Sequence, residues 1–193
     1  PLPPSGELRL EPDRGLVSAR TSDAGPEIDL PPVTDITTTV ELAMALEESE
    51  IGFVIAGVPH LVVRCADVEK VDVMNRGRAL RQSNIRERGA NVNFVSERGG
   101  EWSMRTFERG VEGETLACGT GAVATAVLLA AWTESGDSTS LITRSGLPLT
   151  VRLRREDDLL LPTLAGQGRL VFTGEIEDPS GRAGFDLAEA PQG

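Results

Sequence analysis

The chain has 193 residues, 39% hydrophobic and 25% charged, which is ordinary for one globular domain or slightly more. A net charge of -11 argues against nucleic acid as a partner, because a phosphate-binding protein needs a basic surface. Two cysteines without a CxxC pair argue against structural zinc, and no stretch resembles a signal peptide or membrane span, so we expect a cytoplasmic protein that is not bound to membranes.

Short strand patterns fill the first 40 residues. Polar and apolar residues alternate over residues 7–10, 16–20 and 28–30, with proline and glycine between them, so we expect half-buried strands joined by turns. Residues 37–40 favour a strand. Residues 41–50 fit a helix and a strand equally well, and that segment stays open.

Two continuous apolar runs, residues 51–56 and 61–65, flank the sequence Gly57-Val58-Pro59-His60. This pattern predicts two buried strand pieces that meet at a sharp bend, which presents His60. His60 is the only histidine in the chain. From the residues alone, a hydrogen-bonded structural histidine explains it as well as a functional one does.

Residues 71–83 have the pattern of an amphipathic surface helix, and residues 90–95 that of a strand. The strand alternation places Asn91 and Asn93 on one face. On an inner face these amides could donate hydrogen bonds to a ligand carboxylate. On an outer face they would have no role.

A further strand is predicted over residues 101–109. Glu108 and Arg109 end it on opposite faces, so both can reach one ligand only if the chain bends, and Gly110 and Gly113 permit such a bend. A surface ion pair is the simpler explanation of Arg109.

Cys118 precedes the most apolar segment of the chain. Residues 122–132 contain Thr125 as their only polar residue, which predicts a helix buried on every side and too short to span a bilayer. The free N–H groups of a helix start stabilise a thiolate, and Gly119 and Gly121 let a ligand approach the backbone. A small buried hydrophobe is the alternative role of Cys118, and the flanking glycines favour the reactive one.

After this helix, four short strands are predicted over residues 138–143, 147–153, 158–161 and 169–173. Residues 177–193 are rich in proline, glycine, alanine and acids, which predicts a flexible tail. The whole pattern predicts an α+β fold, in which a barrel-like set of short, mainly antiparallel strands surrounds a central buried helix.

The segment from Glu108 to Ala122 starts with Glu-Arg-Gly and ends with Thr-Leu-Ala-Cys-Gly-Thr-Gly-Ala. It resembles the second-half signature of the diaminopimelate epimerase family. Residues 57–60 are similar to the family's Gly-Asn-Pro-His segment, and residues 89–94 to its Gly-(Ile/Val)-Asn-Val-x-Phe strand. The three matches follow the family order, and the resemblance extends over residues 15–176.

The resemblance implies an isomerase that inverts an amino-acid α-carbon by proton transfer between two thiols. It would interconvert LL- and meso-diaminopimelate, a small-molecule substrate, in lysine and peptidoglycan-precursor biosynthesis, with no cofactor and no metal. Cys118 would be one thiol, and His60 and Glu108 would modulate thiol pKa values. The substrate-binding residues it implies are Asn91, Glu108, Arg109, Gly119 and Thr120.

The family has two domains with one reactive cysteine each, and the first-half motifs Cys-Gly-Asn-Gly and Gly-x-Gly-x-Asp-Gly do not occur here. We therefore expect residues 1–40 to be strands of a missing N-terminal domain, residues 41–176 the C-terminal epimerase-like domain, and residues 177–193 a tail. Cys65 lies five positions after His60, on the other face of a regular strand. The second thiol would then be absent, and we expect this fragment alone to be inactive.

Two departures from the family pattern leave the substrate open. Val58 stands where the family commonly has asparagine, and the turn between Arg109 and Cys118 is one residue longer than usual, which leaves the placement of its two glutamates open. The nearest alternative is a two-thiol racemase of another amino acid, of the proline racemase type. Others are a thiol hydrolase or acyltransferase that uses Cys118 with His60, and a silent ligand-binding domain. The oligomeric state stays open, with a homodimer as one option.

Overall fold

The computed structural model describes residues 6–10, 17–22, 25–83, 85–133, 136–168 and 173. Within them the chain forms β1 (Glu7–Leu10), β2 (Val17–Ser22), β3 (Gly25–Asp29), β4 (Thr34–Thr37), β5 (Glu48–Ala56), β6 (Val58–Cys65), the 3-10 helix η1 (Val68–Lys70), α1 (Val73–Arg81), β7 (Asn91–Arg98), β8 (Glu101–Glu108), β9 (Gly113–Thr115), α2 (Gly119–Trp132), β10 (Ser138–Ile142), β11 (Pro148–Glu156) and β12 (Leu159–Gly166).

The strands form one mixed sheet in the order β1-β2-β3-β12-β11-β10-β8-β7-β6-β5-β4, with β9 on the side of β8. The pairs β6–β7 and β10–β8 are parallel, and the other pairs are antiparallel. In the part of the chain that the structure describes, β1 and β4 end this order without pairing to each other, so the sheet is open. The predicted α+β class with mainly antiparallel strands is confirmed.

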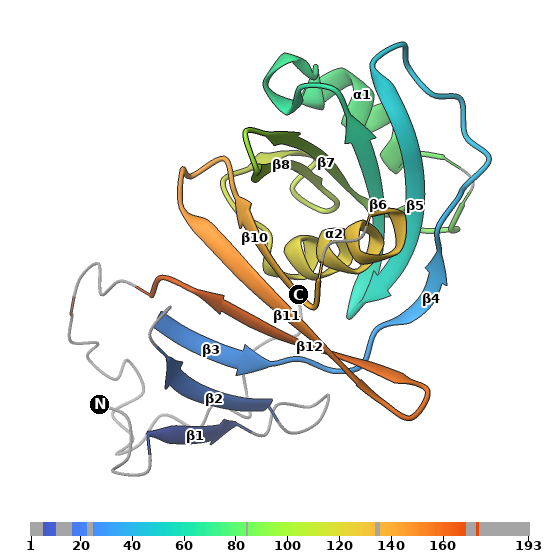
Figure 1. The fold of residues 1–193 in the computed structure, drawn as a ribbon. Helices are drawn as coiled ribbons and strands as arrows, with labels where there is room; N and C mark the ends of the chain where they lie inside the picture. The colour runs from blue at the N-terminus through green and yellow to red at the C-terminus, as the bar shows by residue number, and fades with distance from the viewer. Residues whose placement is uncertain are drawn as a thin grey trace, which may run out of the picture.

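Strands β5 to β8 have a helix on each face (Figure 1). On one face, Leu61 and Val63 of β6 belong to an apolar cluster with Val73 and Leu80 of α1. On the other face, Val62 belongs to a cluster built around α2. Because side chains alternate along a strand, each residue of β6 is assigned to one helix or the other.

Helix α2 is buried over most of its length, as its composition predicts, but Ala131 in its last turn is exposed. Residues 121–129 are all buried, and the helix packs against β5, β6 and β7 as well as β10, β11 and β12. Figure 1 shows it between the strands that curve past it. None of the helices in the described ranges is both long enough and apolar enough to cross a membrane.

Several predicted elements change in extent. The open segment 41–50 has no helix: β5 begins at Glu48, and the residues before it form a loop. The strand expected over residues 37–40 lies earlier, as β4. Gly57, with φ of 72°, forms the predicted bend as the tight turn between β5 and β6. The expectation that this bend presents His60 is wrong, because β6 already begins at Val58 and His60 pairs with Val54 inside the sheet. The predicted tail 177–193 and residues 169–172 lie outside the described residues.

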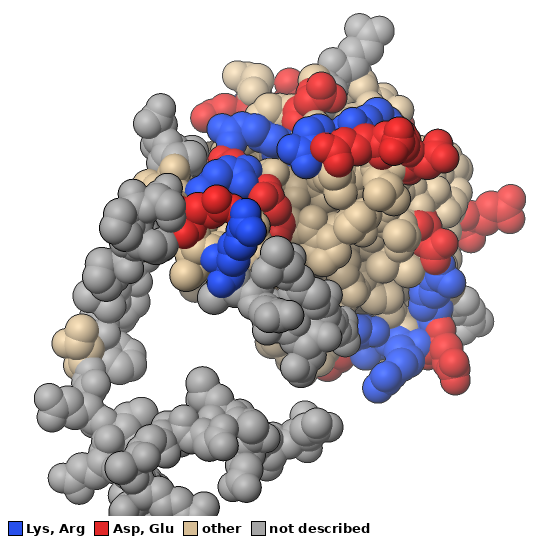
Figure 2. Space-filling view, turned by 90° about the horizontal axis from the view of Figure 1, so that it is seen from below, with Lys and Arg blue, Asp and Glu red and all other residues tan. Residues whose placement is uncertain are grey.

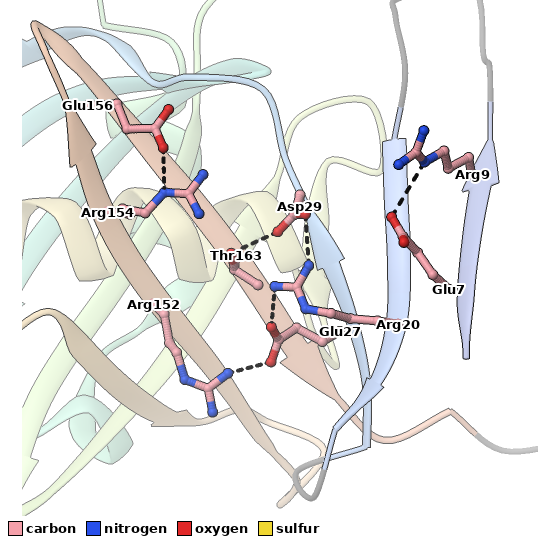
Figure 3. A network of polar contacts seen from close by, with 9 residues as sticks. All are labelled: Glu7, Arg9, Arg20, Glu27, Asp29, Arg152, Arg154, Glu156 and Thr163. Carbon is pink, nitrogen blue, oxygen red and sulfur yellow. Dashed lines mark hydrogen bonds and ion pairs between the residues drawn. The ribbon is translucent and has the colours of Figure 1, made fainter. Parts of the chain in front are cut away.

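The N-terminal strands join the sheet through β3, which pairs with β12. Glu27 of β3 is buried and forms ion pairs with Arg20 of β2 and Arg152 of β11 (Figure 3). Arg20 also donates to Asp29 at 2.8 Å, and this guanidinium holds the pKa of Asp29 below its usual range. These ion pairs connect β2, β3 and β11.

Acidic and basic side chains lie next to one another on the face shown in Figure 2, with an uncharged area between the charged groups. Phosphate binding needs a continuous basic surface. The described residues on this face do not form one.

Candidate active site

Cys118 is the N-cap of α2, with an extended backbone (φ -135°, ψ 108°). Its carbonyl accepts the first helical hydrogen bond from the N–H of Ala122 at 2.9 Å. Its Sγ lies 3.7 Å from Thr120 Oγ1, and the side chain is 7% exposed. The sequence therefore predicted the position of the thiol at the helix start correctly.

The helix start was expected to lower the pKa of Cys118, and this expectation is wrong. Burial raises the pKa of the thiol, because the thiolate would lose its hydration. Hydrogen bonds from the Thr120 side chain and the Gly121 and Thr120 backbone act in the opposite direction, and the nearby Glu108 carboxylate raises the pKa further. Desolvation outweighs the helix start, so the thiol is protonated at neutral pH.

The glycines next to Cys118 serve close packing within the protein. A Cβ on Gly121 would lie 2.3 Å from Asn93 Oδ1 and 3.1 Å from Cys118 Sγ. A Cβ on Gly119 would lie 2.8 Å from Leu164 Cδ2. Both distances to protein carbon or oxygen are too short for a side chain, so the first turn of α2 depends on glycine for its contacts with β7 and β12.

His60 is completely buried on β6. Its Nδ1 lies 3.2 Å from the amide nitrogen of Asn93, and its Nε2 has no hydrogen-bond partner among the described residues. Burial, followed by the positive charge of Arg109, lowers the pKa of His60 to about 3. The ring is therefore neutral across the physiological range.

Asn91 and Arg109 meet at the same edge of the sheet. Asn91 pairs with His60 across β6 and β7, and its Oδ1 accepts a hydrogen bond from the Arg109 backbone N–H at 2.8 Å. The Arg109 guanidinium donates to the carbonyl of Gly89 at 3.4 Å. The structure thus brings three of the predicted residues together, and the amide of Asn91 orients the backbone of the arginine.

The turn after Glu108 settles where the two following glutamates lie. Gly110 and Glu112 have φ of 93° and 56°, so the chain folds back into β9, which pairs with β8. Glu112 forms an ion pair with Arg81 at 2.9 Å, and Glu114 forms a bidentate pair with Arg105 at 2.7 and 2.8 Å. Glu112 and Glu114 therefore pair with arginines and not with the Cys118 thiol.

Thr120 borders a small cavity of about 30 Å³, which Gly57 at the β5–β6 turn also lines. Such a space is far too small for an amino acid. Two larger cavities, of about 330 and 710 Å³, lie beside Cys65 on the other side of the sheet.

Cys65 lies on the opposite face from His60, as its offset predicts. It belongs to the cluster that packs on α1, and its Sγ donates to the Val95 carbonyl at 3.4 Å. Burial, with the nearby Glu48 and Asp67 carboxylates, raises the pKa of Cys65 to about 11. This thiol is not paired with Cys118.

Sequence reasoning missed the link between Asn93 and His60. Asn93 Nδ2 also donates to the Leu61 carbonyl at 3.0 Å, and Asn93 Oδ1 accepts from Thr106 Oγ1 at 3.0 Å. The available signal was the strand alternation, which places Asn93 with Asn91 and Thr106 with Met104. Alternation within each strand does not show that Asn93 of β7 and Thr106 of β8 lie on the same side of the sheet.

The fold resembles that of several solved structures. A PhzF family protein from Enterococcus faecalis has a TM-score of 0.58 and 13% identity, with 86% of this chain and 64% of that chain covered. A putative phenazine biosynthesis PhzC/PhzF protein from Clostridium difficile has a TM-score of 0.59 and 11% identity, with 88% and 65% covered. A protein described as a predicted epimerase, from Pseudomonas aeruginosa, has a TM-score of 0.55 and 15% identity, with 86% and 67% covered.

The sequence profile of diaminopimelate epimerase matches residues 52–166, and the chain belongs to this family. The diaminopimelate epimerase of Gemmatimonas aurantiaca is 49% identical over 180 residues, which cover 88% of this chain and 65% of that protein. Those of Aquifex aeolicus and Methanocella arvoryzae are 35% and 33% identical, with 89% of this chain and 62% and 59% of those proteins covered. The chain thus spans about three fifths to two thirds of the length of these relatives.

Proposed function

We propose that this chain carries one of the two proton-transfer groups of a cofactor-independent diaminopimelate epimerase, with Cys118 as that group. The observation that supports this most strongly is the position of Cys118, at the start of a buried helix inside the family match, with Glu108 close enough to act on its pKa. Diaminopimelate epimerase is also the name of the relatives with the highest identities given above.

Two groups are needed because the reaction inverts a carbon centre. One group removes the α-proton from one face, and a second delivers a proton to the other; a single base would mostly return the same proton. Since the pKa of Cys118 is raised in this state, its S–H is the form present at neutral pH. Cys118 is therefore suited to deliver its proton first and to act as base in the reverse direction.

The groups around Cys118 provide the contacts that an amino acid needs. The backbone N–H groups of Gly119 and Thr120 lie at the helix start, where a carboxylate is stabilised. We propose that Arg109, Asn91 and Glu108 bind the distant amino-acid end of diaminopimelate. A guanidinium with one long hydrogen bond retains donors for bidentate binding of a carboxylate.

Cys65, the other cysteine, lies on the face of β6 opposite His60. The second proton-transfer group would therefore come from outside the described residues. We propose that residues 1–40 supply strands to a second domain, that residues 41–176 form the epimerase-like domain around α2 in a barrel-like manner, and that residues 177–193 are a tail. We also propose a cytoplasmic protein, with a homodimer as one possible assembly. The chain alone is expected to be inactive.

A thiol hydrolase is the weaker alternative. Such an enzyme needs a base that takes the proton of the nucleophile. The Nδ1 atom of His60 bonds to Asn93, no hydrogen bond joins His60 to Cys118 among the residues described, and the pKa of His60 is about 3. A histidine with so low a pKa is a poor base. A racemase of another amino acid, of the proline racemase type, would act on a substrate without the distant amino and carboxylate groups of diaminopimelate, so Arg109 discriminates between the two.

The test is calorimetric binding of meso-diaminopimelate to the chain, compared with proline. Arg109→Ala should weaken diaminopimelate binding by about tenfold or more, since a lost charge-assisted pair contributes about 1.5–3 kcal/mol. Arg78→Ala removes an exposed arginine of α1 and serves as the control. Equal binding of both ligands, or no effect of Arg109→Ala, would contradict the proposal. In D2O, an epimerase lineage predicts exchange at the α-carbon only once the second group is supplied, and a hydrolase predicts none.

A further inference from the structure

A buried row of polar side chains links β6, β7 and β8. His60, Asn93 and Thr106 are 0%, 0% and 2% exposed. The Thr106 hydroxyl donates to Asn93 Oδ1 at 3.0 Å, and Asn93 Nδ2 donates to the Leu61 carbonyl at 3.0 Å. The same Nδ2 faces His60 Nδ1 at 3.2 Å.

These contacts allow only one orientation of the Asn93 amide. If the amide were turned over, its oxygen would face the Leu61 carbonyl oxygen, and two acceptors would oppose each other without water between them. The amide nitrogen must therefore face both Leu61 and His60. Because both of its hydrogens donate, His60 Nδ1 has to be the acceptor, and the single ring proton resides on Nε2.

We propose that Asn93 is a positioning residue, which holds His60 as the neutral tautomer with its proton on Nε2. The Nε2–H group has no hydrogen-bond partner in the described part of the chain. A buried donor without an acceptor is destabilising and rare in native proteins, so such a group needs an explanation. Resting on the proposed function, we assign it an acceptor in the active site: an anionic thiolate or carboxylate. His60 would then act as a hydrogen-bond donor and not as a base.

The asparagine that contacts His60 also lies close to Cys118. The space that a Gly121 Cβ would fill is bounded on one side by Asn93 Oδ1, at 2.3 Å, and on the other by Cys118 Sγ, at 3.1 Å. Asn93 therefore lies beside the thiol as well as beside the histidine. The charge of Arg109 acts on the same ring and disfavours a second ring proton.

The test uses nuclear magnetic resonance of the 15N-labelled chain. Because His60 is the only histidine, its two ring nitrogens give the only imidazole signals. We expect an unprotonated Nδ1 and a protonated Nε2, with no change between about pH 5 and pH 8, the range in which an ordinary histidine titrates. A proton on Nδ1 in the unmodified chain would overturn the proposal without any variant.

Asn93→Asp replaces the donor opposite Nδ1 by an acceptor, so the ring proton should move to Nδ1. Asn93→Leu removes the donor without adding an acceptor, so both tautomers should be populated. Thr125→Val is the matched control, because Thr125 is equally buried, lies on α2 and has a hydroxyl without a hydrogen-bond partner among the described residues. It should leave the tautomer unchanged.

A purely structural role of Asn93 would lower stability without moving the proton. An unchanged Nε2–H tautomer in folded Asn93→Asp, or the absence of any Nδ1–H form in folded Asn93→Leu, would therefore contradict the proposal. The ring signals are measured without substrate. The tautomer result can fail while diaminopimelate binds, and binding can fail while the tautomer is as expected.

Discussion

The two faces of strands β6 to β8 are both buried, yet they differ in polarity. The α1 face packs apolar side chains such as Leu61, Val63 and Phe94 around Cys65. The α2 face places His60, Asn93 and Thr106 in an equally dry core that ends at Cys118. Burying polar groups is costly unless each is hydrogen-bonded, so the α2 face needs the hydrogen bonds of Asn93 and Thr106 in addition to its apolar packing, whereas the α1 face is packed mainly by apolar side chains.

The two cysteines show the same contrast. Burial raises the pKa of both thiols. Each thiol also has nearby carboxylate charge that raises its pKa and hydrogen bonds that lower it. At Cys65 the effect of the Glu48 and Asp67 carboxylates exceeds that of the hydrogen bonds, whereas at Cys118 the Thr120 and Gly121 hydrogen bonds exceed the effect of Glu108. Desolvation therefore does not distinguish the two thiols; the balance between nearby hydrogen bonds and carboxylates does.

The largest predicted effect in this comparison is a loss of stability in acid that is caused by His60. Its pKa is about 3 in the folded chain and 6.5 in the reference state, so the unfolded chain takes up a proton first as pH falls. The contribution is present above about pH 6.5 and is lost as pH falls toward 3, at about 1.4 kcal/mol per pH unit. Between about pH 6 and pH 4 the free energy of unfolding should fall by roughly 2–3 kcal/mol through His60 alone.

Urea unfolding at several pH values measures this loss, with His60→Gln as the comparison. Asp29, Glu112 and Glu114 also have lowered pKa values and lose stabilisation in acid, but they are present in both proteins and cancel. If the free energy of unfolding fell equally with pH in both proteins, burial on the α2 face would not be keeping His60 uncharged.

Substitution of Gly121 should have the next largest effect. Gly121→Ala places a methyl group against Asn93 Oδ1 and Cys118 Sγ, and such overpacking costs about 1–3 kcal/mol. Gly136→Ala is the control, since a Cβ there meets nothing within 4 Å, and its effect should stay within about 0.5 kcal/mol. Chemical denaturation measures both. A neutral Gly121→Ala would mean that the thiol and the asparagine are not held in contact with this turn.

The smallest expected effect is a difference in alkylation rate between the two thiols. With Cys65→Ser and Cys118→Ser, each remaining thiol can be followed by mass spectrometry at mildly alkaline pH. Cys118 should react about tenfold faster, because backbone donors stabilise its thiolate and the pKa of Cys65 is about 11. Equal rates, or faster reaction of Cys65, would remove the distinction between the two faces.

Local pattern was sufficient for much of the fold. The run after Cys118 predicted the buried helix α2, since no surface helix lacks polar residues on every side. Strand alternation predicted that Cys65 lies opposite His60. Residues 41–50 stayed open, because their composition suits both regular structures. Pairing with β6 made residues 48–50 the start of β5, and residues 41–47 form a loop.

The amino-acid sequence by itself determined the family and the place of Cys118 at a helix start, because periodicity and motif order are properties of the chain. Only the tertiary structure decided the partners of Glu112 and Glu114, the bond between Asn93 and His60, and the direction of the Cys118 pKa shift. Each of these depends on contacts between residues distant in sequence and on how much water their packing removes.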